Sequence, residues 1–381
     1  MSGVTGASRV SPRVAMVTAR AQPEIGGIES HVAEVARRLA AAGVDVEVLT
    51  TDRTGDLTRA ERAEGYVVRR FRAYPRGRDW YLSPGLFLAV LRSRADLVHV
   101  QGVHTLVPPV AMLAALLRRV PFVLTFHSGG SSSAFRSRSR GLQFRLLAPL
   151  LRRARALVGV SDFEVARFQA VVGAVPQVRL VRNGGSLPAL REAVEPDPDL
   201  VVSAGRLERY KGHHRVIEAL PHLLATRPGA RVEILGSGPY EAELLALADR
   251  LGVADRVAVR FVPPVDRAAM ARALARAGVV ALLSDYEAHP VAVMEALVVG
   301  RPVLVSRTSG LTELADRHWA RGVDPGASPA EVAAALEAQL SAPETPAPAE
   351  LPTWEGCSTA LADLYDQVLL RTLPPVSAGA A

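Results

Sequence analysis

The 381-residue chain contains little cysteine, lysine or aromatic side chain, and these shortages exclude several classes of protein. Its one cysteine, Cys357, cannot form a disulfide within the chain, and no CxxC motif or cysteine–histidine cluster suits structural zinc. No apolar run reaches the roughly 18 residues of a membrane-spanning helix, and the first residues lack the apolar core of a secretion signal. We therefore expect a cytoplasmic protein without disulfides or structural zinc.

The basic side chains are almost all arginine. One lysine, Lys211, stands among 45 basic residues, and the formal net charge is +7. Aromatic residues make up 5% of the chain, and it contains no helix-turn-helix, RNP or zinc-finger pattern, so the charge does not indicate a nucleic-acid partner. A single lysine in a chain that otherwise uses arginine indicates a position that needs a compact ammonium group.

Short β-branched runs alternate with segments of helical period, which predicts an α/β protein built on parallel sheets. An acidic stretch with two prolines, 191–200, interrupts the alternation and reads as a linker between two halves. The predicted strands are 13–18, 45–50, 97–100, 122–126, 157–160 and 178–181 in the first half, and 200–204, 231–235, 257–262, 279–283 and 302–306 in the second.

The alternation predicts two domains of similar size. We expect an N-terminal Rossmann-like domain over 1–190 and a C-terminal Rossmann-like domain over 191–353. An amphipathic helix over 354–371 and a flexible tail over 372–381 complete the chain.

Glycine-rich or polar loops follow the predicted strands of both halves. Ligands of doubly wound sheets bind where the strands end, so these loops are candidates for a binding site. Because they come from both halves, we expect two domains facing each other across a cleft. The loops are 23–29, 127–130, 161–162, 205–206, 236–238 and 284–290.

Gly26 and Gly27 precede a predicted helix, where backbone N–H groups could approach an anion. A tight turn between strand and helix explains the same pair, since no GxGxxG or Walker motif is completed. The Gly236-Ser237-Gly238 loop carries the same two interpretations, and both stay open at this point.

The sharpest local signal is the stretch 205–212, GRLERYKG. Arg206 as a planar fork and Lys211 as a point charge could together neutralise a diphosphate. The alternative is a solvated basic loop.

Glu287 and Glu295 are eight residues apart and are separated by Pro290, which can open a helix as its first residue. Glu287 then lies in the loop before that helix and Glu295 about a turn and a half inside it. Both carboxylates would lie near one helix N-terminus, where they could accept hydrogen bonds from vicinal sugar or ribose hydroxyls.

Together these motifs resemble glycosyltransferase family 4 over about residues 12–371. The resemblance rests on the 23–29 loop, the GRLxxxKG stretch, the GSGP loop at 236–239, the E-x7-E helix and the GRPV and SGxxE motifs at 300–303 and 309–313. It implies a GT-B fold, in which the N-terminal domain binds the acceptor and the C-terminal domain binds a nucleotide sugar. It also implies that the final helix, 354–371, crosses back onto the first domain.

The resemblance further implies roles for individual residues. Arg206 and Lys211 would hold the donor diphosphate, Glu287 and His127 would contact the transferred sugar, and Glu295 would contact the ribose. The residues expected to be catalytic are His127, Arg206, Lys211 and Glu287. Those expected to bind the donor are Gly26, Gly27, Gly205, Gly236, Gly238, His289, Pro290, Val291 and Glu295.

The expected reaction moves a sugar from a UDP- or GDP-sugar to the hydroxyl of a small molecule, a glycolipid or a glycan, with retention of configuration. No second carboxylate is assignable as a nucleophile at glycosidase spacing, which favours a front-face path. Because two side-chain cations can take the role of a metal, we expect no metal requirement and no cofactor besides the nucleotide sugar.

Two other interpretations stay open, a nucleotide-sugar epimerase of similar architecture and a noncatalytic sugar-nucleotide-binding protein. His99 and His104 could be a metal pair, although a packed strand and an acceptor-side loop explain them better. An acid-free, arginine-rich stretch could touch anionic lipid at the inner membrane face, or could be an ordinary solvated helix. Its arginines are Arg136, Arg138, Arg140, Arg145, Arg152, Arg153 and Arg155.

Overall fold

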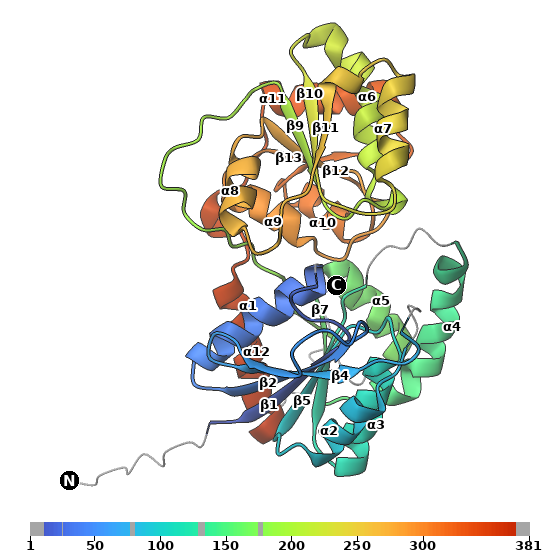
Figure 1. The fold of residues 1–381 in the computed structure, drawn as a ribbon, viewed down its shortest axis with the longest axis vertical. Helices are drawn as coiled ribbons and strands as arrows, with labels where there is room; N and C mark the ends of the chain where they lie inside the picture. The colour runs from blue at the N-terminus through green and yellow to red at the C-terminus, as the bar shows by residue number, and fades with distance from the viewer. Residues whose placement is uncertain (1–10, 25, 77–80, 129–133, 174–177, 371–381) are drawn as a thin grey trace, which may run out of the picture.

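Two sheets of mainly parallel strands organise the chain, one in each half (Figure 1). The structure is a computed structural model that describes residues 11–24, 26–76, 81–128, 134–173 and 178–370; for 134–142 it describes the backbone alone. Helices connect most successive strands in both halves, because parallel neighbours need a crossover connection, whereas β2, β3 and β4 follow one another without a helix. The predicted α/β class is therefore confirmed.

The N-terminal sheet has eight strands in the order β3-β4-β2-β1-β5-β6-β7-β8, and β3 is its antiparallel member. All five residues of β5 are buried, as expected for a parallel strand covered on both faces. The strands are β1 Arg13–Thr18, β2 Asp45–Asp52, β3 Ala60–Arg62, β4 Val67–Arg72, β5 Leu97–Gln101, β6 Phe122–Thr125, β7 Ala156–Gly159 and β8 Val178–Leu180. The helices are α1 Gly27–Ala41, α2 Pro84–Arg92, α3 Val107–Arg118, α4 Ala134–Leu151 and α5 Asp162–Val172.

The C-terminal sheet has six parallel strands in the order β11-β10-β9-β12-β13-β14. The strands are β9 Leu200–Ala204, β10 Arg231–Leu235, β11 Val257–Arg260, β12 Val279–Leu282, β13 Val303–Ser306 and β14 Arg321–Val323. The helices are α6 His213–Thr226, α7 Glu241–Arg250, α8 Arg267–Ala275, α9 Val291–Val298, α10 Ser309–Asp316 and α11 Pro329–Ser341, with short 3-10 turns at η1 Arg209–Lys211, η2 Ala254–Arg256 and η3 Pro348–Glu350. Buried apolar clusters lie on both faces of the sheet.

Each predicted strand is present, but β3, β4 and β14 were not predicted. β3 is exposed at all three residues, and β4 carries arginines at positions 69, 70 and 72. β14 has the sequence Arg-Gly-Val, and pairs in parallel with β13 at the sheet edge. β3 and β14 are edge strands, which need no apolar run, and β4 lies between β3 and β2 but is half arginine, so the sequence pattern does not reveal them.

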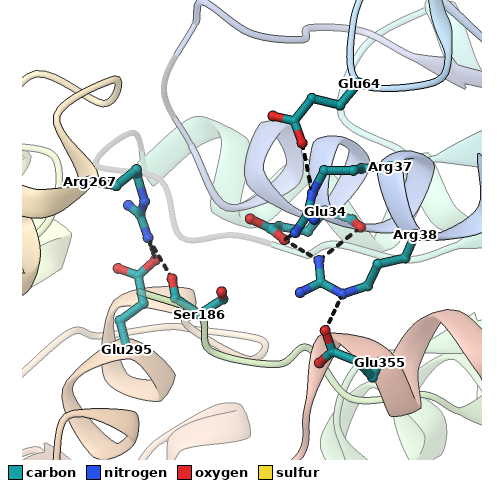
Figure 2. A network of polar contacts seen from close by, with 8 residues as sticks. All are labelled: Glu34, Arg37, Arg38, Glu64, Ser186, Arg267, Glu295 and Glu355. Atoms are coloured by element: carbon teal, nitrogen blue, oxygen red, sulfur yellow. Dashed lines mark hydrogen bonds and ion pairs between the residues drawn. The ribbon is translucent and has the colours of Figure 1, made fainter. Parts of the chain in front are cut away.

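The last helix, α12 Trp354–Leu370, returns from the C-terminal domain and packs against α1 of the N-terminal domain. Trp354 and Tyr365 are buried there, and the Tyr365 hydroxyl lies 2.6 Å from Nδ1 of His99. Arg38 of α1 donates to Glu355 at 2.7 Å and also contacts Glu34 (Figure 2). The amphipathic pattern of α12 thus buries its apolar face on a domain far away in the sequence.

Candidate active site

Lys211 and Glu287, 76 residues apart, form an ion pair at the carboxyl ends of the C-terminal strands. Nζ of Lys211 lies 2.6 Å from Oε1 of Glu287, and the hydroxyl of Ser284 donates to the same oxygen at 3.0 Å. Burial disfavours the charge on Lys211, but the Glu287 carboxylate more than offsets it, so the pKa of Lys211 lies above its ordinary value. The chain's only lysine is therefore a protonated cation whose side chain is largely buried, with 15% of it exposed.

Gly212 allows the backbone to turn from η1, which ends at Lys211, into α6. Gly212 has φ 74° and begins α6 as its N-cap, a conformation that a side chain disfavours. A Cβ at this position would overlap the carbonyl of Leu283, at the end of β12. The close approach of the two loops brings Lys211 to Ser284 and Glu287.

Arg206 lies in the loop after β9, with about half of its side chain exposed. Nη2 donates to the hydroxyl of Tyr210 at 2.9 Å, and Nη1 lies 2.9 Å from Glu208. The same loop is held against the Gly236–Gly238 turn, because N–H of Leu207 donates to the carbonyl of Ser237 at 2.9 Å. A Cβ on Gly236 would overlap the carbonyl of Gly205.

Glu287 is fixed through its backbone by the start of α10. Ser309 accepts from N–H of Glu287 at 2.8 Å and donates to its carbonyl at 2.7 Å, and N–H of Gly310 donates to that carbonyl at 2.9 Å. Pro290 is the N-cap of α9 and not its first helical residue, which corrects the predicted position by one residue. His289 is buried beside it, and Val291 begins the helix.

Glu295, on the fifth residue of α9, is buried and paired with Arg267 at the start of α8 (Figure 2). Arg267 also donates to the carbonyl of Ser186 at 3.0 Å. Burial raises the pKa of Glu295, and Arg267 opposes that rise. Arg267 could not be recognised as a site residue from the sequence, because no local feature distinguishes it from the other 43 arginines.

His127 follows β6 and is buried at the carboxyl end of the N-terminal sheet. Its Nε2 lies 2.9 Å from Oε1 of Gln101, and its ring meets the ring of His31 edge-on at 4.5 Å. Burial, with His31, His99 and His104 nearby, holds the pKa of His127 well below its usual range. His127 is therefore neutral near pH 7, and donation from Nε2 to Gln101 leaves Nδ1 as an acceptor.

The two histidines weighed as a metal pair, His99 and His104, have separate partners. His99 is buried in β5, with Thr125 at 2.7 Å from Nε2, whereas His104 contacts the carbonyl of His127 from the loop before α3. Within the described residues no group of three or more histidine, cysteine, aspartate or glutamate side chains is placed to hold a metal ion.

Gly26 is the N-cap of α1 and Gly27 is its first residue, so the predicted loop does open a helix. The carboxylate of Glu29, which is buried, lies against Gly26, and a Cβ there would overlap it. The pKa of Arg206 is lowered by burial and raised more strongly by Tyr210, Glu208 and, from the other domain, Glu29. An acid, Glu29, therefore already lies at the N-terminus of α1.

The carboxyl ends of the two sheets meet. Ser128 follows β6 and Tyr286 follows β12, and their hydroxyl oxygens lie 2.8 Å apart. N–H of Asp162, after β7, donates to Glu313 of α10 at 2.8 Å. The predicted site residues of both domains therefore lie along one boundary, although no sequence motif marks Ser128 or Tyr286 as contacts between domains.

Two family models match this chain, one in each half. The model described as Glycosyltransferase Family 4 matches residues 25–186, and the model described as Glycosyl transferases group 1 matches residues 190–349. D-inositol 3-phosphate glycosyltransferase 2 of Catenulispora acidiphila is 30% identical, over 95% of this chain and 96% of its own. The chain belongs to glycosyltransferase family 4. It is a glycosyltransferase, so the epimerase and noncatalytic interpretations are set aside.

Two solved structures share the fold of this glycosyltransferase. Sucrose-phosphate synthase from Thermosynechococcus elongatus superposes with a TM-score of 0.73 at 20% identity, covering 94% of this chain and 100% of the other. HepE from Anabaena, in complex with UDP-glucose, superposes with a TM-score of 0.67 at 19% identity, covering 95% and 99%. The two-domain architecture is the GT-B fold.

The arginine-rich α4 is described only in part. Arg136, Arg138 and Arg140 lie outside the residues whose side chains the structure describes, whereas Arg145, Arg152, Arg153 and Arg155 are exposed. Phe144 is buried in the core of the N-terminal domain, but Leu146 is 71% exposed. Among the described helices, none has both the length and the apolar content to cross a membrane.

Proposed function

We propose that this glycosyltransferase transfers a sugar from a nucleoside diphosphate to an acceptor hydroxyl, with retention of configuration and without a metal ion. The observation that carries the proposal is the Lys211–Glu287 pair at 2.6 Å, with Arg206 in the adjoining loop. A buried cation beside a carboxylate suits a ligand that carries phosphate charge next to sugar hydroxyls.

The donor proposed is a UDP-sugar, with a GDP-sugar as the alternative. The HepE structure, which shares the fold, is described with UDP-glucose. In this chain Glu295 would accept from the ribose hydroxyls and the 205–212 and 236–238 loops would surround the diphosphate. His127, with Nδ1 as an acceptor, would receive a hydroxyl of the transferred sugar.

In the proposed front-face path, the bond from the anomeric carbon to the β-phosphate oxygen breaks while the acceptor oxygen approaches from the same face. The acceptor proton passes to the departing phosphate oxygen, so no protein nucleophile is required. Negative charge grows on the leaving phosphate, and Arg206 and Lys211 would stabilise it. Two cations in this place supply the charge that a metal ion would otherwise provide.

The acceptor is proposed only as a hydroxyl compound that enters from the N-terminal domain. The relative from Catenulispora acidiphila is named for an inositol phosphate, and the protein from Thermosynechococcus elongatus for a sugar phosphate product. These names indicate different substrates on a similar fold, so the fold alone does not identify the acceptor of this chain.

A thermal-shift titration with UDP, GDP, ADP and their sugar conjugates, in EDTA, tests the donor. A ligand at about 100 times its Kd stabilises the folded state by roughly 2.7 kcal/mol. We expect one nucleotide family to raise the Tm, and Lys211→Ala to remove the rise. Proton NMR of the product made from that donor then reads the anomeric configuration. A product of inverted configuration, or a requirement for magnesium, would contradict the proposal.

We also propose peripheral contact of the exposed face of α4 with anionic lipid. Arg145 is exposed there beside Leu146, and Arg152 and Arg153 are exposed in the turn that follows the helix. Flotation with vesicles containing about 30% anionic lipid should carry the protein upward, whereas neutral vesicles should not. Equal recovery with both kinds of vesicle would rule this contact out.

A further inference from the structure

Tyr286 reaches from the C-terminal domain into the N-terminal domain, one residue before Glu287. Its hydroxyl lies 2.8 Å from Oγ of Ser128 and 2.8 Å from Nη1 of Arg167. Its ring meets Phe163 edge-on at 5.6 Å and lies beneath the guanidinium of Arg167. The side chain is therefore held by the other domain through both its polar and its aromatic parts.

The hydrogen bonds of this contact form a chain in which each group donates to the next, from Arg167 to Glu164. Arg167 can only donate, so the oxygen of Tyr286 accepts from it and the Tyr286 hydroxyl donates to Oγ of Ser128. Ser128 has one proton, and its hydroxyl donates to Oε1 of Glu164 at 2.5 Å. Chains of aligned hydrogen bonds polarise and strengthen one another.

Glu164 anchors the chain in the N-terminal domain. It is wholly buried in α5, and it also accepts from N–H of Ser128 at 2.6 Å and from N–H of Val160 at 3.0 Å. Burial raises the pKa of Glu164, while these donors and Arg167 favour the ionised form. Because Ser128 is fixed through both its backbone and its side chain, it offers Tyr286 an acceptor in a set place.

The loop that carries Tyr286 is fixed at its other end. N–H of Asp285 donates to the carbonyl of Tyr210 at 2.8 Å, next to Lys211. Glu287 is held through its backbone by Ser309 and Gly310. The residues on both sides of Tyr286 therefore belong to the Lys211–Glu287 arrangement.

We propose that Tyr286 is a positioning residue that sets the spacing between the two domains at the reacting centre. Its partner Ser128 adjoins His127, and Tyr286 itself adjoins Glu287. The contact between Ser128 and Tyr286 thus lies one residue away from each of the two predicted sugar-binding residues, His127 and Glu287. The kinetic part of this inference rests on the proposed sugar transfer, whereas the spacing itself does not.

A second contact between the domains lies nearby but does not have these properties. Arg317 contacts Asp162, and Arg182 contacts Asp162 and Glu313. Asp162 and Arg317 are about half exposed, so their ion pair contributes little to stability, whereas Arg182 and Glu313 are mostly buried. None of these four residues adjoins a predicted site residue by a single peptide unit, so we assign the positioning role to Tyr286.

The kinetic test compares Tyr286→Phe, Ser128→Ala and the double variant in the full chain. We expect each single variant to lower kcat by about tenfold, the effect of losing one hydrogen bond of ordinary strength, with a smaller change in donor KM. The double variant should be no slower than Ser128→Ala, because Ser128→Ala already removes the link that Tyr286→Phe removes. Tyr66→Phe, which alters a buried tyrosine packed away from the boundary, is the control.

A distance measurement tests the spacing without any assay of activity. Spin labels at Arg153→Cys and Arg250→Cys, exposed positions of the two domains, should give one narrow distance in the parent chain. Tyr286→Phe should broaden or lengthen it, and Tyr66→Phe should leave it unchanged. An unchanged distance distribution overturns the inference, as does a wild-type kcat in Tyr286→Phe. If no donor supports transfer in the parent chain, the proposed function fails, and the distances still decide the spacing.

Discussion

Nζ of Lys211 lies 2.6 Å from Oε1 of Glu287, so the chain's single lysine meets a carboxylate that the sequence singled out independently. The two residues come from different loops, after β9 and after β12, which are neighbouring strands of the C-terminal sheet. Adjacent strands of a parallel sheet bring their carboxyl ends together, which is why these two loops meet.

Lys211→Ala should lower kcat/KM for the nucleotide sugar by about 100-fold or more, because it removes a buried cation from the place where phosphate charge would grow. Steady-state kinetics with the donor found by thermal shift would measure the change. Arg256→Ala, which removes an exposed cation elsewhere, is the matched control. Near wild-type turnover in Lys211→Ala would remove Lys211 from the mechanism.

Glu287→Gln should lower the free energy of unfolding by about 3 kcal/mol, because Lys211 then stays buried without its carboxylate. Urea unfolding followed by circular dichroism gives this quantity. Combining Lys211→Met with Glu287→Leu should recover most of the loss, since neither charge is then left alone. Strictly additive losses would show that the two side chains do not stabilise each other.

Arg267→Met should make donor binding sensitive to pH in a range where the parent enzyme is insensitive. Burial raises the pKa of Glu295, Arg267 opposes the rise, and Glu34 adds to it, so removing Arg267 raises that pKa further. Protonation then removes an acceptor for the ribose as pH falls toward that higher pKa, and donor KM should rise. KM measured from pH 8 to pH 5 checks this, with Glu295→Gln as the variant that should show no such dependence. Identical profiles for parent and Arg267→Met would contradict it.

Stability should fall as pH drops from about 6.5 toward 4. Burial lowers the pKa of His31 and His213 to about 4, and that of His99 and His289 to about 3, from the ordinary 6.5. In this window the unfolded chain binds more protons than the folded one. Each histidine therefore lowers the free energy of unfolding by up to about 1.4 kcal/mol for each unit by which the pH falls. Denaturant unfolding at pH 7 and pH 5 measures the difference. A free energy of unfolding that stays constant would mean that these histidines remain hydrated.

Gly236→Ala should abolish donor binding in the thermal-shift titration, because the added Cβ would displace the carbonyl of Gly205 and with it the Arg206 loop. Gly356→Ala is the control, since this glycine is exposed in α12, where alanine is the better helix former. If Gly236→Ala binds nucleotide as the parent does, the 236–238 turn is a structural turn only.

The site could be predicted from the sequence only in part. GRLERYKG and the two glutamates are informative because each lies beside a strand whose apolar run is visible, so their place at a sheet end follows from local pattern. Ser128, Tyr286 and Arg267 carry no such signal. Their contacts depend on which loops meet across the domains and on which arginine among 44 reaches Glu295.

The sequence by itself determined the α/β alternation, the break near 191–200 and the amphipathic helix that became α12. Hydrophobic periodicity and the positions of prolines reveal these features, because both influence the backbone conformation of only a few residues at a time. Tertiary structure decided that α12 packs on α1, that Lys211 meets Glu287 and that Tyr286 enters the N-terminal domain. Such contacts join segments 76 to more than 300 residues apart, and their energy depends on strand order, burial and the partner's charge, none of which a local pattern contains.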